Sequence, residues 1–335
     1  MGPLTFHRIA LATLLSSLWF APLLRAAQPP DEVLDEVVVI GEQPGPPMWK
    51  LSKDGHTMWI MGTLAPVPAK MTWRSKQAEA VIARSGEILG NTSARADVKV
   101  GFFGKLSLVP SLLRLRNNPD GATLQQALPP DVYARFSTMY RRYYGKDPDP
   151  KETSRPLFAA NEIYSRSLEK SGLAEANPVW PVVTKLAKQH KVRIRQRDIE
   201  VPIEDPKGLI AEVAKIPRDK EVACLVATLD YIDRELPNIK RRATAWAVGD
   251  VPALRALPAA ADRTDCLNAL LEQPKLAAKV APLKNDIEAD RAGIFSWMLL
   301  TYETSFTAMP VEYLLHDEEL ITRWRAAGYT VEEPR

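Results

Sequence analysis

Histidines, and the acids beside them, are the residues of this 335-residue chain that could bind a metal ion or transfer a proton at neutral pH. Of the four histidines, His7 lies in an apolar N-terminal stretch, which leaves His56, His190 and His316 for a site. No two of them have the i, i+4 spacing with which one helix presents two imidazoles to zinc. His316 begins HDEEL, whose acids could ligate a metal or could open the last helix. We adopt the second interpretation, because acids in a first turn complement the helix dipole.

Motifs of other chemistries are absent from the sequence. It contains no G-x-S-x-G nucleophile elbow, no P-loop, no G-x-G-x-x-G dinucleotide loop and no H-E-x-x-H zinc helix. The stretch TMWIMGTLAPVPAKM, residues 57 to 71, has the form of a strand that ends in a site loop stiffened by prolines. Ala65 stands at the tip of that loop and can do no chemistry. The residues by themselves therefore identify no reaction.

The elements around these residues predict an α/β fold. Two short apolar runs around Lys53-Asp54-Gly55 predict a β-hairpin. Helical insertions are expected around residues 106–172 and 206–275. The remaining expected elements are a helix leading into a strand at 75–90, a helix leading into one strand at 179–201, a helix up to Leu300, a strand at 304–309, a loop, a helix that begins at the acids of HDEEL, and a last short strand.

The first 27 residues have the features of a secretory signal peptide. Arg8 precedes an apolar run from Ile9 to Leu24, and the small residues Ala26 and Ala27 follow. The run is shorter than the ~20 residues that a membrane-spanning helix needs. We therefore expect cleavage near Ala26 or Ala27, no stable membrane span afterwards, and a periplasmic or secreted mature protein.

Residues 28–47 predict an acidic, proline-containing linker with a β-branched patch, VVVI, at 37–40. A single α/β domain is expected over 48–335. Removal of the signal peptide takes away two arginines and no acids, so the formal charge falls from +3 to +1 (3 − 2 = 1). A nearly neutral chain gives no electrostatic reason to bind nucleic acid.

The two cysteines, Cys224 and Cys266, both lie in the part expected to be exported. In an oxidising compartment such a pair is most simply a disulfide. Two buried free thiols are the alternative. A metal site on this pair is disfavoured because the spacing contains no C-x-x-C element.

Four stretches of the chain are similar to one known family. They are MWKLSKDGHTMWIMGTLAPVP from residue 48, ARSGEILGN from residue 83, DREL through AWAVGDVPAL with a W-x-x-G-D turn at 246–250, and TAMPVEYLLHDEELITRWRAAGYTVEEP from residue 307. Together they cover nearly all of residues 48–335, and the chain resembles the TraB/GumN family, relatives of the Tiki metalloproteases and of the erythromycin-esterase-like fold. The resemblance implies a central mixed sheet with flanking helices and a large helical insertion.

In active relatives, two Gly-x-x-His motifs and an acidic residue are thought to form a metal site, with an Arg-Asn pair ahead of the second motif. Carried over to this sequence, the first motif falls on Gly62-Thr63-Leu64-Ala65, the acidic position on Asn91, the second motif on Pro310-Val311-Glu312-Tyr313 and the pair on Arg291-Ala292. A divalent ion draws most of its affinity from imidazole, thiolate or carboxylate donors. Alanine, asparagine and tyrosine do not supply that set.

The resemblance therefore implies an exported protein with a degenerate metallohydrolase site, no metal cofactor and a binding or accessory role in the envelope. The expected partner is an unknown envelope protein or a peptide or glycan ligand. Whether the protein is an enzyme stays open at this point. The implied site is concave and lined by Thr63, Ala65, Asn91 and Tyr313.

Two alternatives remain. The first is an active metal-dependent peptidase or hydrolase whose site has been rebuilt from other residues, namely Asp198, Glu312, His316 or Arg291. The second is an envelope interaction protein, linked to exopolysaccharide production, in which the VVVI patch adds a strand to a partner sheet.

Overall fold

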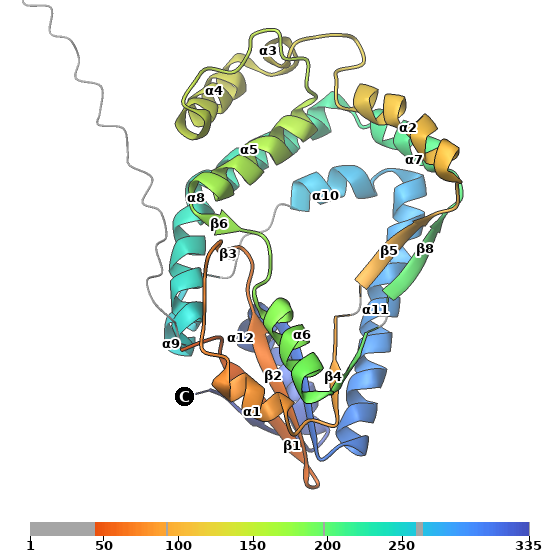
Figure 1. Cartoon of the computed structure of the whole chain (residues 1–335). Coiled ribbons are helices and arrows are strands. Elements are labelled where there is room, and N and C mark those ends of the chain that lie inside the picture. Colours follow the sequence, from red (N-terminus) through yellow and green to blue (C-terminus); the bar gives the residue numbers. More distant parts are fainter. Residues whose placement is uncertain (1–43, 92, 197, 259–263, 335) are drawn as a thin grey trace, which may run out of the picture. The chain divides into compact units, whose positions relative to one another are not determined.

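Figure 1 shows a computed structural model of the chain, which describes residues 44–91, 93–196, 198–258 and 264–334. The expected signal peptide and the VVVI patch of the expected linker lie outside these residues. All of the described residues belong to one compact unit, Asp35–Arg335. No helix among them is long and apolar enough to cross a membrane.

The main sheet has six strands, of which β1, β2 and β4 are labelled in the lower half of Figure 1. Its strands lie in the order β10 (Thr330–Glu332), β1 (Met48–Lys53), β2 (His56–Thr63), β9 (Thr304–Pro310), β4 (Glu87–Leu89) and β7 (Arg193–Arg195). Strand β1 is antiparallel to both of its neighbours, whereas β2, β9, β4 and β7 run parallel to one another. The expected central mixed sheet is therefore confirmed.

The hairpin of β1 and β2 turns at Asp54 and Gly55, which both have positive φ, 50° and 83°. An Asp-Gly pair in this conformation is the signature of the two-residue turn that matches the twist of antiparallel strands. The hairpin predicted from this dipeptide is confirmed.

The central strands are buried on both faces. Side chains of β2 and β9 that are at most 1% exposed include Met58, Ile60, Met61, Phe306 and Ala308. Such continuous apolar runs are typical of parallel strands covered by helices on both sides. The covering helices α1 (Lys76–Ile82), α6 (Val179–His190), α11 (Pro274–Thr301) and α12 (Val311–His316) contact the strands or one another, and their apolar side chains join the same core.

Both predicted insertions are helical. The first contains α2 (Phe102–Leu115), α3 (Leu124–Ala127), α4 (Pro130–Tyr144) and α5 (Pro156–Lys170), and the second contains α7 (Pro206–Ala214), α8 (Arg218–Val248), α9 (Val251–Ala256) and α10 (Thr264–Leu271). Helix α5 packs along α8, and α2 packs on α7, so the two insertions share contacts. A short pair, β3 (Val67–Pro68) and β6 (Leu173–Ala174), connects the loop after β2 to the end of the first insertion.

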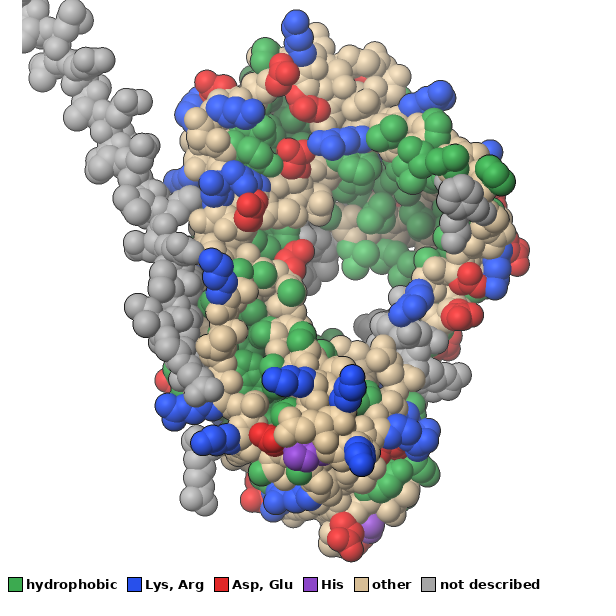
Figure 2. Space-filling view, viewed as in Figure 1, with side chains coloured by type: hydrophobic (Ala, Val, Ile, Leu, Met, Phe, Trp, Pro, Cys, Tyr) green, Lys and Arg blue, Asp and Glu red, His purple; other side chains and the backbone are tan. Residues whose placement is uncertain are grey.

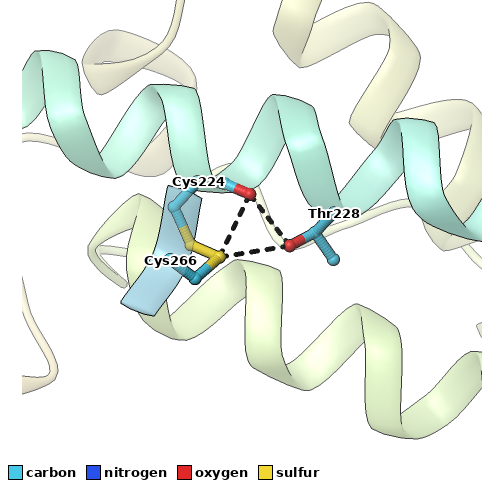
Figure 3. Close-up of a disulfide and its surroundings, with 3 residues drawn as sticks. All are labelled: Cys224, Thr228 and Cys266. Atoms are coloured by element: carbon cyan, nitrogen blue, oxygen red, sulfur yellow. Dashed lines mark hydrogen bonds between the residues drawn. A yellow bond between two sulfur atoms is a disulfide. The ribbon is translucent and has the colours of Figure 1, made fainter. Parts of the chain in front are cut away.

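The second insertion is tied internally by a disulfide between Cys224 of α8 and Cys266 of α10 (Figure 3). Thr228, one helical turn after Cys224, donates a hydrogen bond from its hydroxyl to the Cys224 carbonyl oxygen at 2.8 Å. The predicted bond is thus present, and it joins helix α10 to the long helix α8 within the second insertion.

Two sequence-based expectations were wrong. The single strand expected within 192–201 is split into β7 and β8 (Asp198–Ile203), because the chain leaves the central sheet after Arg195. Strand β8 then pairs in parallel with β5 (Ser93–Val98), which follows β4. A second sheet therefore forms from the two segments that follow β4 and β7 out of the first sheet. Alternation of apolar and polar residues predicts a strand but does not identify the strand with which it pairs. The loop expected after residue 309 is helix α12.

The C-terminal expectation holds. Asp317 accepts a hydrogen bond from the Leu320 backbone N–H at 2.8 Å and caps α13 (Glu318–Ala326), whose first turn contains Glu318 and Glu319. These acids stand where the helix dipole favours negative charge.

Arginines of β7 serve the sheet. The carboxylate of Glu87 in β4 is fully buried and is bound by Arg193 Nε at 2.5 Å and by Arg195 Nε at 3.0 Å. The guanidinium of Arg195 also lies over the ring of Trp297. The charges at the end of this strand therefore neutralise a buried acid.

Candidate functional site

The segments that contain the aligned motif positions all leave the central sheet at the same edge. In the parallel pair of β2 and β9, Thr63 lies opposite Pro310, so the loop that carries Ala65 and the helix that carries Tyr313 begin side by side. Strand β4 flanks β9 on its other side, and Asn91 follows it by two residues. The carboxyl ends of adjacent parallel strands are where open α/β sheets bind ligands. This edge is the candidate site.

Gly62, the glycine of the first motif, lies against Val311 of the second. A Cβ atom at Gly62 would be 2.9 Å from Val311 Cγ2 and 3.1 Å from Trp49 Cζ3. Such distances are below ordinary van der Waals contact, so a side chain at this position would displace the second motif. The glycine is therefore explained by close packing of the two motifs.

The W-x-x-G-D turn also contacts the first motif, through a hydrogen bond from Trp246 to Gly62. Trp246 is fully buried, and its indole Nε1 donates to the Gly62 carbonyl oxygen at 2.8 Å. Gly249 ends α8 in the left-handed conformation, with φ of 74°. Asp250 then caps α9 by accepting from the Ala253 backbone N–H at 2.9 Å. Trp246, Gly249 and Asp250 each have a structural role in the turn.

The side chains at the candidate site differ in exposure. Thr63 is 6% exposed, whereas Ala65 and Asn91 are exposed and Tyr313 is 51% exposed. Val311 and Leu314 anchor α12 in the core, which directs Tyr313 to the surface of the same helix. The edge thus presents a methyl group, an amide and a phenol to its surroundings.

Comparison with known proteins identifies the family of the chain. Residues 47–333 match the TraB/PrgY/gumN family. The chain belongs to this family. No curated protein and no solved structure matches the chain. The match includes the hairpin, both insertions and both strand ends of the candidate site, so this mixed-sheet architecture is the TraB/PrgY/gumN fold of this chain.

A charged cluster that the sequence did not reveal lies beside the second motif of this TraB/PrgY/gumN protein. Arg242 of α8 is 4% exposed, and its Nε lies 3.3 Å from Glu312 Oε1. Its Nη2 donates to the Pro258 carbonyl oxygen at 2.8 Å, and Glu235 lies 4.0 Å away. Arg242 precedes the buried Trp246 by one helical turn, and this spacing was the available signal that the arginine faces inward.

Two residues of the alternative site are brought together by this cluster. Glu312 Oε2 lies 3.5 Å from His316 Nε2, one turn later on α12. Since Glu312 also binds Arg242, its carboxylate is engaged on both oxygens. The pair is therefore a charge network of α8 and α12, with His316 as its partly exposed end.

The other two alternative residues have different surroundings. Arg291 of α11 lies close enough to Tyr313 to interact electrostatically; burial lowers the pKa of its guanidinium, and Tyr313 opposes that shift. An arginine remains charged at neutral pH despite such a shift. Asp198 is the first residue of β8 and pairs with Ser93 in the second sheet; its side chain lies outside the described part.

The residues at the three aligned positions do not fit a divalent metal ion. Ala65 has no side-chain donor atom, Asn91 offers a neutral amide, and Tyr313 offers a phenol. Among the described residues, no three His, Cys, Asp or Glu side chains come together as a possible ligand set. The three side chains at this edge are therefore unsuited to hold a divalent ion.

Proposed function

We propose that this TraB/PrgY/gumN protein is an exported binding or accessory protein of the cell envelope that does not carry out metal-dependent hydrolysis. One observation carries the proposal: three adjacent parallel strands bring Ala65, Asn91 and Tyr313 to one sheet edge, and none of the three supplies a strong metal ligand. Three simultaneous replacements at one edge are more informative than any one of them.

The packing around this edge supports retention of its shape. Gly62 still accommodates Val311, and Trp246 still holds the Gly62 carbonyl oxygen. A sheet edge held by such contacts can keep a ligand-binding surface after its metal ligands are replaced. The exposed ring of Tyr313 and the amide of Asn91 offer apolar contact and hydrogen bonds, which suit a peptide or a glycan.

The test compares the metal content of the mature protein, residues 28–335, with that of a variant carrying Ala65→His, Asn91→Glu and Tyr313→His. We expect the wild type to purify without stoichiometric zinc or manganese and the variant to bind one ion. Near-stoichiometric metal in the wild type, together with peptide hydrolysis that a chelator abolishes, would overturn the proposal. A matched variant with Ala65→Asn, Asn91→Gln and Tyr313→Phe controls for altered surface shape without adding ligands.

A rebuilt hydrolase is the second candidate, and the contact between Glu312 and His316 favours it. If this pair formed a reactive site, Glu312→Gln and His316→Asn would abolish any hydrolysis by the wild type. Hydrolytic activity equal to that of the wild type in both variants would exclude this pair from the reaction.

The proposed export and the VVVI interaction have separate tests. Fractionation of cells that produce the full chain should place a shortened protein outside the cytoplasm. Deletion of residues 28–47 should abolish capture of an envelope partner without lowering the melting temperature if VVVI adds a strand to that partner. Capture by the deletion variant would exclude this role for the patch.

A further inference from the structure

A cavity of about 120 Å³ lies among the helices of the first insertion. It is formed by α3, α4, α5 and the segment that joins α4 to α5. Its buried apolar wall is made of Leu124, Phe136, Ala159 and Ile163. Figure 2 shows hydrophobic side chains bordered by acidic and basic ones over this group of helices. None of the lining residues belongs to the central sheet or to the two motifs.

The charged groups that line the cavity are mainly acidic. They are Asp147, Asp149, Glu152, Glu162 and Lys146, with a formal sum of −3 (1 − 4 = −3). Arg141 binds Asp147 at 2.7 Å, and Arg116 binds Glu162 at 2.8 Å. Two of the four carboxylates are thus paired with arginines.

The other two carboxylates are held by backbone groups. Asp149 Oδ1 accepts from the Lys151 N–H at 2.9 Å, and Glu152 Oε1 accepts from the Ser154 N–H at 3.0 Å. Each carboxylate keeps a second oxygen that can accept from a ligand. These bonds fix the carboxylates in place without neutralising their charge.

Ser154 provides an independent indication of a ligand. It lines the cavity, it is 2% exposed, and its Oγ has no hydrogen-bond partner among the described residues. Buried hydroxyl groups nearly always have a hydrogen-bond partner, so this hydroxyl indicates a bound ligand in the cavity. The segment around it is well fixed, because Asn118 donates to the Ser154 carbonyl oxygen at 3.2 Å and to the Ala122 carbonyl oxygen at 2.9 Å.

An aromatic ring completes the cavity. Tyr140 stacks on Tyr144 with ring centroids 4.1 Å apart. Burial raises the pKa of Tyr140, and the nearby carboxylates of Glu162 and Glu152 raise it further. The same negative potential that opposes loss of the phenolic proton attracts a cation, and the ring face favours it as well.

We propose that this cavity binds a primary alkylammonium group. Its three N–H donors match three acceptors, namely the free oxygens of Asp149 and Glu152 and the hydroxyl of Ser154. Its methylene stem packs on the apolar wall, and Tyr140 lies beside its charge. The group belongs either to a free diamine or to a lysine side chain of a peptide.

The size of the cavity sets the class of ligand. It holds about four waters at ~30 Å³ each, which is room for a chain of four or five heavy atoms. Pockets for drug-sized molecules span about 300–1,000 Å³. A whole sugar ring or a folded peptide therefore does not fit inside, whereas the end of an alkylammonium chain does.

The test is calorimetric titration of the mature protein with n-butylammonium chloride and, separately, with n-butanol, which has the same number of heavy atoms and no charge. We expect saturable binding of the cation to one site with a Kd on the order of 1 mM or lower. The alcohol should bind at least ~10-fold more weakly. Equal binding of both ligands, or no saturable binding of the cation because water alone fills the cavity, would overturn the proposal.

Variants locate the binding. Glu152→Gln keeps the shape of the side chain and removes its charge, and it should weaken binding about 10-fold. Glu175→Gln is the matched control at an exposed carboxylate outside the cavity and should leave the Kd unchanged. Lys146→Met should tighten binding because it removes a competing cation from the lining. Equal effects of the two Glu→Gln changes, with melting curves showing both folded, would refute this location.

Two further ligands identify the source of the ammonium group. Putrescine represents free diamines, and a short peptide with one internal lysine represents protein partners. Binding of either one in competition with butylammonium supports the site, and the tighter one names the source. Failure of both to compete would contradict it. This site is separate from the proposed function, since the metal content measured at the sheet edge does not depend on Glu152.

Discussion

Arg155 at the start of α5 is expected to be one of the most important side chains for stability. It is 3% exposed and forms an ion pair with Glu221 of α8, which is also buried. It further donates to the Val213 carbonyl oxygen at 2.9 Å and contacts that of Leu115 at 3.5 Å. One guanidinium therefore joins the ends of α2 and α7 to α8.

Arg155→Met should lower the free energy of unfolding by about 3–5 kcal/mol, because it leaves the Glu221 carboxylate buried without its partner. The double variant Arg155→Met, Glu221→Leu should be less damaged than this single variant by roughly 2 kcal/mol or more, since it removes the stranded charge as well. The two carbonyl groups that lose their donor keep the double variant below the wild type.

Urea unfolding followed by tryptophan fluorescence gives these free energies from the midpoint and the slope. Arg255→Met is the matched control, because Arg255 pairs with Glu333 at 3.0 Å on the surface, and it should cost at most about 1 kcal/mol. A double variant as unstable as Arg155→Met, or a single variant no worse than the control, would refute the reasoning.

Three further predictions concern other contacts. Gly62→Ala should cost about 1–3 kcal/mol in urea unfolding through its contact with Val311, and no loss would mean that the second motif adjusts freely. Burial raises the pKa of Glu221 above its ordinary 4.5, so its stabilising contribution is complete below that pH and is lost as pH rises through the folded-state pKa. Glu221→Gln should flatten the pH dependence of the urea midpoint over this range, and an unchanged slope would contradict the shift. Replacing Cys224 and Cys266 together by alanine should cost about 4 kcal/mol on the chain-entropy argument for a separation of 42 residues, and an unchanged melting temperature would show that the bond adds nothing.

Much of the fold could be predicted because its signals are local. Asp54-Gly55 predicted the hairpin, the acids after His316 predicted the last helix, and the only two cysteines of the sequence predicted the disulfide. The positions of the candidate site came from a family resemblance, which named the residues to compare, and they stay a prediction. A ligand for this edge could not be predicted, because Ala65, Asn91 and Tyr313 have side chains of no single chemistry.

The sequence by itself determined the α/β class and the two helical insertions. Only the tertiary structure decided that residues 192–203 divide between two sheets, that Arg242 binds Glu312, and that Ser154 faces a cavity with Asp149 and Glu152. The physical reason is that periodicity and turn chemistry act over a few residues. The partner of a buried charge or an unpaired hydroxyl is chosen by packing between segments far apart in the chain.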